Sequence, residues 1–91
     1  MIFEWDPHKA GLNEAKHGVR FEEAASALAD HLSLTNPDPL HSEEEDRFVT
    51  FGMSSRQRVI VVVHTAREGR IRLIGARVAT PREVRAYEHN P

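Results

Sequence analysis

The chain has 91 residues, of which 40% are hydrophobic and 29% charged, a composition typical of a small globular domain and not of a disordered segment. It contains no cysteine, which excludes a disulfide scaffold and thiolate zinc sites. No apolar run approaches the roughly 18 residues of a membrane span, and the first residues lack a signal-peptide pattern. We therefore expect one domain over residues 1–91, located in the cytoplasm and without a membrane partner.

The net charge of −2 conceals an uneven distribution of charge along the chain. Residues 1–55 carry four basic and eleven acidic side chains, a net charge of −7, whereas residues 56–91 carry eight arginines and three glutamates, a net charge of +5. Arginine is the basic side chain best suited to bidentate contact with phosphate. The second part therefore favours a surface for a polyanion. The alternative is that its arginines are solvated or pair with acids from the first part.

The first 30 residues predict a short strand and two helices. Residues 2–5 alternate between apolar and polar side chains, as an edge strand does. Asp6 and Pro7 suit the start of a helix that should end near residue 17, because Gly18 is the expected C-terminal cap. A second helix is predicted over residues 19–30, where an apolar stripe rich in alanine indicates close packing against the sheet or the first helix.

Residues 30–46 are the least regular part of the chain. The prolines at positions 37 and 39 favour extended geometry before them, and a further short strand around residues 32–34 remains an open alternative. The acidic run over residues 43–46 is expected to be solvated. Docking of this run on the arginines, or on a basic partner, stays open.

The remainder predicts three strands and a last helix. Strands are expected over residues 47–53, 58–65 and 71–78, and the β-branched run at residues 59–63 indicates that the middle one is buried on both faces. Gly69 can take a positive φ and close the last hairpin. Thr80 and Glu83 form a capping box that opens a final helix, which Tyr87 would help to hold on the sheet. The predicted fold class is α+β, with a small, mainly antiparallel sheet and the order β-α-α-β-β-β-α.

The six histidines show none of the spacings of a metal site, and the phosphate-loop and dinucleotide-binding motifs are missing. We therefore predict neither a metal nor a cofactor. RNA cleavage by 2′-hydroxyl attack requires a proton acceptor, cations for the phosphorane and a proton donor for the leaving oxygen. His17 or His64 could transfer a proton, and Arg67 and Arg77 could hold the phosphate. Tyr87 could donate a hydrogen bond or stack on a base.

Each of these residues also has a structural interpretation. Lys16 and His17 lie in the last turn of a helix, where cations interact favourably with its dipole. His64 follows a buried run directly and is more typical of a core or edge histidine. Tyr87 could simply pack.

The arginines of the second part differ in position. By parity Arg77 shares a strand face with Leu73, an awkward place for a charge unless a bulge at Gly75 redirects it or a carboxylate such as Glu22 or Glu83 pairs with it. Arg67, at a strand end, has a position that suits a function. The side chains predicted to be ordinary surface charges are Arg56, Arg58, Arg70 and Arg85.

Motifs along nearly the whole chain resemble those of the BrnT family of toxins. In the first half these are Phe3-Glu4-Trp5-Asp6-Pro7, Lys16-His17-Gly18-Val19 and Phe21-Glu22-Glu23-Ala24. In the second half they are Arg58-Val59-Ile60-Val61-Val62-Val63-His64-Thr65-x-Arg67, Ala76-Arg77 and Thr80-x-Arg82-Glu83-x-x-x-Tyr87. The sequence departs from the family at Gly75, commonly Ser, and at Gln57, often Gly.

The resemblance implies a RelE-like fold and a toxin of a type II toxin–antitoxin pair, a metal-independent endoribonuclease that inhibits translation. It also implies a ribbon-helix-helix antitoxin that binds the toxin in a heterotetramer, and operator DNA binding only through that complex. The residues that it assigns to catalysis are Arg67, Arg77, His17, Lys16 and Tyr87. Arg47 and Arg72 are assigned to RNA binding.

Two other functions compete with the nuclease. One is a non-catalytic interaction module, whose arginines bind an acidic partner and assemble a repressor. The other is a general single-stranded nucleic-acid binder, which is less favoured because the strands lack interleaved aromatic residues for stacking.

Overall fold

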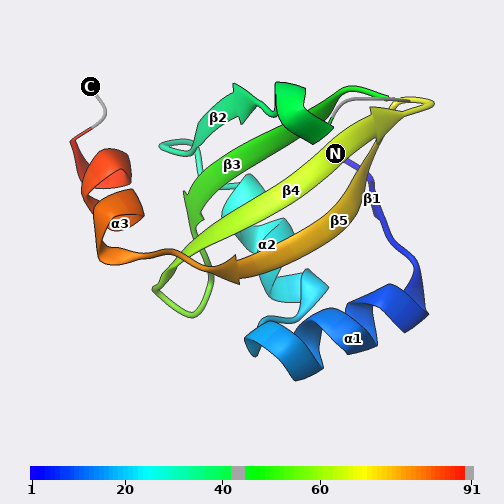
Figure 1. Cartoon of the computed structure of the whole chain (residues 1–91), viewed down its shortest axis with the longest axis horizontal. Coiled ribbons are helices and arrows are strands. Elements are labelled where there is room, and N and C mark those ends of the chain that lie inside the picture. Colours follow the sequence, from blue (N-terminus) through cyan, green and yellow to red (C-terminus); the bar gives the residue numbers. More distant parts are fainter. Residues whose placement is uncertain (42–44, 90–91) are drawn as a thin grey trace.

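A twisted five-stranded sheet forms the centre of the fold (Figure 1). The structure is a computed structural model that describes residues 1–41 and 45–89. The strands are β1 (Phe3–Glu4), β2 (Leu34–Pro37), β3 (Arg47–Met53), β4 (Val59–Arg67) and β5 (Arg70–Val78), and their order in the sheet is β1-β5-β4-β3-β2. The helices are α1 (Pro7–His17), α2 (Phe21–Leu28) and α3 (Pro81–Glu88), with a 3₁₀ turn, η1, at Pro39–His41.

The sheet has five strands and is mixed, so the prediction of a small, mainly antiparallel sheet needs correction. β1 pairs with β5 in parallel, whereas the other three pairings are antiparallel. The predicted edge position of β1 is confirmed, but its direction depends on where two helices return the chain, which no local pattern specifies. The strand considered around residues 32–34 exists as β2 and lies slightly later, which adds a strand to the predicted order.

The predicted ends of α1 are confirmed. The Asp6 carboxylate accepts hydrogen bonds from the backbone N–H groups of His8 and Lys9, and Pro7 occupies the first turn. Gly18 ends the helix in the left-handed conformation at φ 68°, and its N–H donates to the Glu14 carbonyl. These contacts are local, and for that reason the sequence predicts them well.

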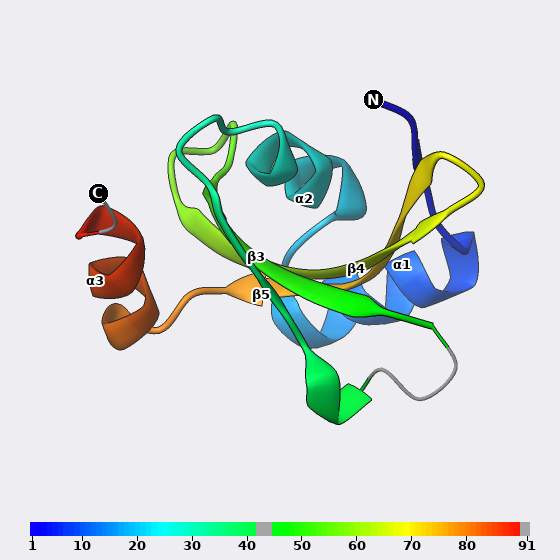
Figure 2. The same cartoon turned by 90° about the horizontal axis from the view of Figure 1, so that it is seen from above.

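Helix α2 covers one face of the sheet and builds the core (Figure 2). It is shorter than the predicted 19–30, because Val19 packs into the core ahead of the helix and the chain turns at Ala29. Phe21 and Ala27 are fully buried in this core. The helix lies so close to β3 that a Cβ atom on Gly52 would stand 2.2 Å from the Ala27 carbonyl oxygen. The close packing that the alanines predicted is confirmed.

The final helix is only lightly attached. The capping box of Thr80 and Glu83 is present as predicted, but α3 has no buried residue and stands beyond the end of the sheet (Figures 1 and 2).

In the part of the chain that the structure describes, no helix is long and apolar enough to cross a membrane.

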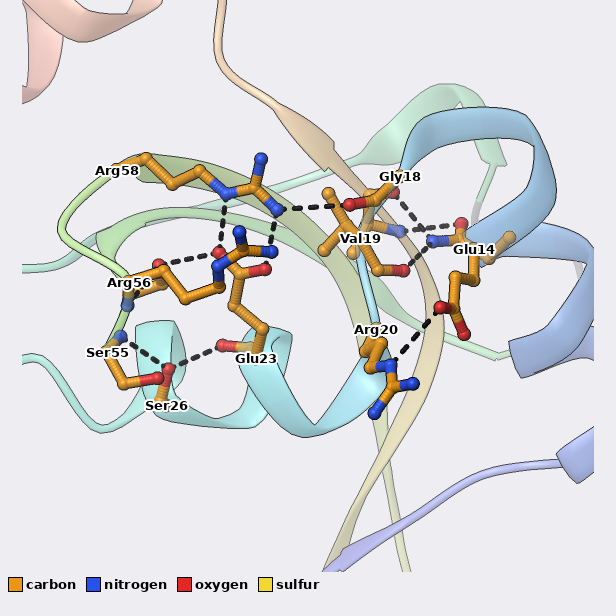
Figure 3. A network of polar contacts seen from close by, with 12 residues as sticks. Glu14, Gly18, Val19, Arg20, Glu23, Ser26, Ser55, Arg56 and Arg58 are labelled. Carbon is orange, nitrogen blue, oxygen red and sulfur yellow. Dashed lines mark hydrogen bonds and ion pairs between the residues drawn. The ribbon is translucent and has the colours of Figure 1, made fainter.

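A polar network joins α2 to the start of β4 (Figure 3). Arg58 donates from Nε and Nη2 to the two carboxylate oxygens of Glu23, each at 2.7 Å, and also from Nη2 to the Gly18 carbonyl at 3.0 Å. The buried Ser54 hydroxyl donates to the same carboxylate at 2.7 Å. Arg58 holds the pKa of Glu23 below its ordinary value. The prediction that Arg58 is an ordinary surface charge is wrong, because its partner comes from a helix 35 residues earlier.

Candidate functional site

The face of the sheet opposite α2 carries its side chains in transverse rows. The register places Arg47, Thr65 and Arg72 in one row across β3, β4 and β5. The next two rows contain Val49, Val63 and Gly75, and then Phe51, Val61 and Arg77. We call this surface the open face. It faces the viewer in Figure 1, with α2 behind the strands.

A bulge in β5 decides which side chains reach the open face. Val63 pairs with Gly75 but the next residue, His64, pairs with Leu73, so Ile74 is an extra residue on β5. As a result Leu73 and Ala76 are both buried in the core, and Arg77 lies on the other side of the strand. The predicted redirection of Arg77 by a bulge beside Gly75 is confirmed.

Asn13 fixes helix α1 to the edge of β5, at a point that β1 does not reach. Its amide nitrogen donates to the carbonyls of Ala76 and Val19 at 2.9 and 3.0 Å, and its oxygen accepts from the Ala76 N–H at 3.1 Å. The side chain thus supplies the hydrogen bonds that a further strand would give β5 beyond the two residues of β1. His17, one helical turn after Asn13, is thereby held beside the sheet.

The first hollow on the open face, the cationic cavity, has a volume of about 160 Å³. Its lining residues are Asp6, Lys9, Glu45, Arg47, Arg67, Arg72, Leu73 and Ile74. The structure thus brings together Arg67 and the two arginines predicted to bind RNA. Four basic side chains here face two carboxylates, which leaves an excess of positive charge.

Glu45 belongs to the acidic run and lies on Arg67. The Nη2 atom of Arg67 donates to both Glu45 oxygens, at 2.9 and 3.2 Å, and this carboxylate holds the pKa of Arg67 above its ordinary value. For Glu45 the alternative of docking on an arginine is confirmed. Residues 43 and 44 of the run lie outside the described residues.

The second hollow, the valine cavity, has a volume of about 390 Å³ and lies beside the cationic cavity along β5. Its lining residues are Asn13, His17, Asp38, Val49, Val61, Val63, Gly75, Ala76 and Arg77. Two of the predicted catalytic residues, His17 and Arg77, therefore meet at one site. Lys16 adjoins it in a shallower hollow that His17 also lines.

Arg77 is held by a carboxylate, as one of its two interpretations predicted. Its Nη1 and Nη2 atoms donate to the two oxygens of Glu83 at 2.7 and 2.8 Å. This ion pair lowers the pKa of Glu83 to about 2. The Arg77 side chain remains 43% exposed, and a guanidinium has five N–H donors, so donors remain for a ligand in the cavity.

The structure does not bring Tyr87 into either cavity. Its hydroxyl donates to Asp30 Oδ2 at 2.5 Å, and Asp30 also accepts from the Met53 N–H at 2.9 Å. The bond to Asp30 raises the pKa of Tyr87 to about 12. The phenol therefore fastens α3 to the end of α2 and β3.

His64 has the structural role that was predicted for it. Its Nε2 atom lies 2.8 Å from the Thr50 hydroxyl, and its ring stacks on Phe48 with a centroid distance of 5.9 Å. Burial lowers its pKa. Of the two histidines predicted to transfer a proton, His17 is the one that lies on the open face.

Several lining residues were not among the predicted site residues. Lys9, Asn13 and His17 are four apart, so the helical period could have placed Lys9 beside the other two. Glu45 had a weaker signal, the acidic run that could dock on the arginines, and Asp38 had none, because the chain brings it to the open face from the irregular region.

The open face thus presents arginines, a lysine and a histidine around an apolar floor. Such a set can bind phosphates, stabilise a pentacovalent phosphorane and move protons. In the described ranges, 1–41 and 45–89, no group of three histidine, aspartate or glutamate side chains could hold a metal ion.

Of the comparisons with known proteins, one shows a family and one shows a shared fold. No curated protein sequence matches the chain. The crystal structure of the Brucella abortus ribonuclease toxin, BrnT, matches with a TM-score of 0.68 and 23% sequence identity, over 88% of this chain and 99% of that one. At this identity the match shows a shared fold. The model of the family described as "Ribonuclease toxin, BrnT, of type II toxin-antitoxin system" matches residues 5–83. The chain therefore belongs to the BrnT family of ribonuclease toxins of type II toxin–antitoxin systems.

Proposed function

We propose that this chain cleaves RNA on its open face by 2′-hydroxyl attack, without a metal ion, and thereby inhibits translation. The observation that carries the proposal is the meeting of His17 and Arg77 in one cavity beside a second, cationic cavity. Phosphoryl transfer of this kind needs positioning and charge stabilisation more than covalent chemistry from the protein.

Each step has a residue on the open face. His17 takes the proton as the 2′-oxygen forms its bond to phosphorus, and Arg77 stabilises the negative charge of the phosphorane. The bond from phosphorus to the 5′-oxygen then breaks and leaves a 2′,3′-cyclic phosphate. Lys16, next to His17 on α1, gives a proton to the departing 5′-oxygen. The flanking phosphates of the substrate lie on the cationic cavity, where Arg47, Arg67 and Arg72 bind them.

Tyr87 acts indirectly in this scheme. The bond from its hydroxyl to Asp30 keeps α3 in place, and α3 carries the Glu83 carboxylate that orients Arg77. It is a positioning residue, and it does not touch the reacting atoms.

The proposed partners are supported by the family, whose toxins have an antitoxin, and by the positive charge of the open face. A ribbon-helix-helix antitoxin covers the basic surface in a heterotetramer, so that RNA is excluded until the antitoxin is lost. Operator DNA is bound only through that complex.

A cleavage assay tests the nuclease. The purified chain is incubated with a single-stranded RNA of mixed sequence in EDTA, and products are followed for the cyclic phosphate end. We expect His17→Ala and Arg77→Ala to slow cleavage at least about 100-fold. The matched control is Arg20→Ala, an exposed arginine outside both cavities, whose rate should stay within about twofold. Thermal unfolding of each variant shows that it is folded.

Three outcomes would contradict the proposal in whole or in part. RNA that stays intact with the folded wild-type chain both in EDTA and with added Mg²⁺ removes the nuclease activity, and full activity of both variants moves the site elsewhere. Loss of activity in EDTA with recovery on adding Mg²⁺ would refute metal independence alone.

The two carboxylate pairs on the open face favour a second function. Arg77 donates to Glu83 from two nitrogens in bidentate geometry, and Arg67 donates from Nη2 to both oxygens of Glu45. Both arginines could bind the carboxylates of an acidic partner in the same way. A non-catalytic interaction module would bind its antitoxin without arresting growth. Expression of the chain alone in a bacterial host separates the two, since a nuclease should stop growth and degrade transcripts.

A further inference from the structure

The floor of the valine cavity is an apolar strip. Val49, Val63 and Gly75 lie in one row across three neighbouring strands, with Val61 beside them. Strands lie about 4.8 Å apart, so the row spans roughly 10 Å. Gly75 leaves its end of the strip uncovered, because a Cβ atom there would meet only Asn13 Oδ1 within 4 Å, at 3.8 Å. The strip and the volume of about 390 Å³ suit a flat aromatic ring system.

The polar groups at the two ends of this strip have opposite charge. Asp38 follows β2 at one edge of the sheet, where its N–H donates to the Arg47 carbonyl at 2.8 Å. His17 and Arg77 stand at the other end, on α1 and β5. A ligand that fits must therefore have apolar faces, a hydrogen-bond donor edge at one end and an anion at the other. A nucleotide has all three.

The carboxylate at the first end selects among the four bases. Guanine presents two adjacent donors, N1–H and the N2 amino group, which match the two oxygens of a carboxylate. Adenine and cytosine present an amino group next to an acceptor nitrogen, and uracil presents one N–H between two carbonyls, so each would place a lone pair against the carboxylate. A carboxylate has about four lone-pair sites, so it can accept from a base in addition to partners in the protein.

We infer that the valine cavity binds the guanine base on the 5′ side of the cleaved phosphate, and that Asp38 determines this preference. The inference rests on the proposed RNA cleavage for its biological meaning, and it goes beyond it by naming the base and the residue that reads it. His17 and Arg77 meet the 3′-phosphate of the same nucleotide.

Nucleotide binding tests the pocket without any cleavage step. The folded chain is titrated with each of the four nucleoside 3′-monophosphates, and Kd is measured by calorimetry or amide chemical shifts. We expect 3′-GMP to bind about tenfold or more tightly than the other three, because a bidentate base contact discriminates by that order. Asp38→Asn should weaken 3′-GMP about tenfold and remove the preference. Gly75→Val, which fills the strip, should weaken all four nucleotides.

Controls make a failure informative. Glu14→Gln changes an exposed carboxylate outside the cavity and should leave all four Kd values unchanged. Equal binding of the four nucleotides, an unchanged preference in folded Asp38→Asn, or no binding at all would each overturn the inference. Preferred 3′-GMP binding with intact RNA would keep the pocket and remove the nuclease. RNA cleavage without any base preference would keep the nuclease and remove the guanine pocket.

Discussion

Glu83 binds Arg77 through two parallel hydrogen bonds of 2.7 and 2.8 Å, across the junction between β5 and α3. The same carboxylate accepts the Thr80 N–H at 2.9 Å and so completes the capping box of α3. One side chain thus orients a residue of the open face and starts the last helix.

This pairing predicts a stability that depends on acid pH. The pKa of Glu83 is about 2 in the folded chain and 4.5 ordinarily, so its contribution is present above pH 4.5 and is lost as the pH falls towards 2. The full effect would be about 3 kcal/mol, and solvent around the part-exposed Arg77 reduces it to about 1–2 kcal/mol. We expect the free energy of unfolding, measured with urea, to fall by about 1–2 kcal/mol more between pH 6 and pH 2.5 in the wild type than in Glu83→Gln. Parallel pH profiles of the two proteins would contradict the prediction.

The hydrogen bond between Tyr87 and Asp30 predicts a raised phenolic pKa that can be measured. Tyr87 is the single tyrosine of the chain, so absorbance near 295 nm reports its phenolate alone. We expect the phenol to titrate with a pKa of about 12 in the folded chain and near 10 in the urea-unfolded chain, because its hydroxyl donates a hydrogen bond to the Asp30 carboxylate in the folded chain. The hydrogen bond to Asp30 stabilises the fold below pH 10, and this contribution to the free energy of unfolding is lost as the pH rises towards 12. Asp30→Asn should lower the folded pKa, and a native titration near 10 would show that the bond to Asp30 is absent.

The ion pair of Glu23 and Arg58 predicts a large stability effect. Glu23 is 6% exposed and also accepts from Ser54, so Glu23→Ala leaves a guanidinium and a hydroxyl without their partner. We expect a loss of about 2–4 kcal/mol in the free energy of unfolding. The matched control is Glu14→Ala, which breaks the exposed pair with Arg20 and should cost less than about 1 kcal/mol. Equal losses in the two variants would refute the distinction between a buried and an exposed pair.

Two glycines predict opposite responses to alanine. At Gly52 the new methyl group would meet the backbone of Ala27 at 2.2 Å, so α2 must move away from the sheet, and we expect a loss of more than about 3 kcal/mol. At Gly11, within α1, nothing lies within 4 Å, and alanine should stabilise the chain by about 0.5–1 kcal/mol. Thermal unfolding of both variants checks this pair. A Gly52→Ala protein as stable as the wild type would mean that the helix and strand are less closely packed.

A strained turn predicts one stabilising substitution. Gln57 has a φ of 62°, in the left-handed region that favours glycine. Gln57→Gly should therefore raise the free energy of unfolding by about 0.5–1 kcal/mol. Ser55→Gly in the same loop, where no such angle occurs, should not stabilise the chain. A lower stability of Gln57→Gly, measured by urea unfolding, would contradict the prediction.

The sequence by itself determined the local structure of this protein. The caps of α1 and α3, the strand β3 and the turn at Gly69 were predicted, because each depends on residues within a few positions of one another. The uneven charge and the family motifs also predict a phosphate-binding surface.

Only the tertiary structure decided which of these residues act together. Asn13 reaches Ala76, 63 residues later, and Arg58 reaches back 35 residues to Glu23. The parallel direction of β1 and the face on which Arg77 lies likewise depend on the packing of distant segments, as does the placement of Asp38 and His17 at the two ends of one cavity. Such contacts form when the whole sheet and its helices bury their apolar surface together, so no short stretch of sequence encodes them.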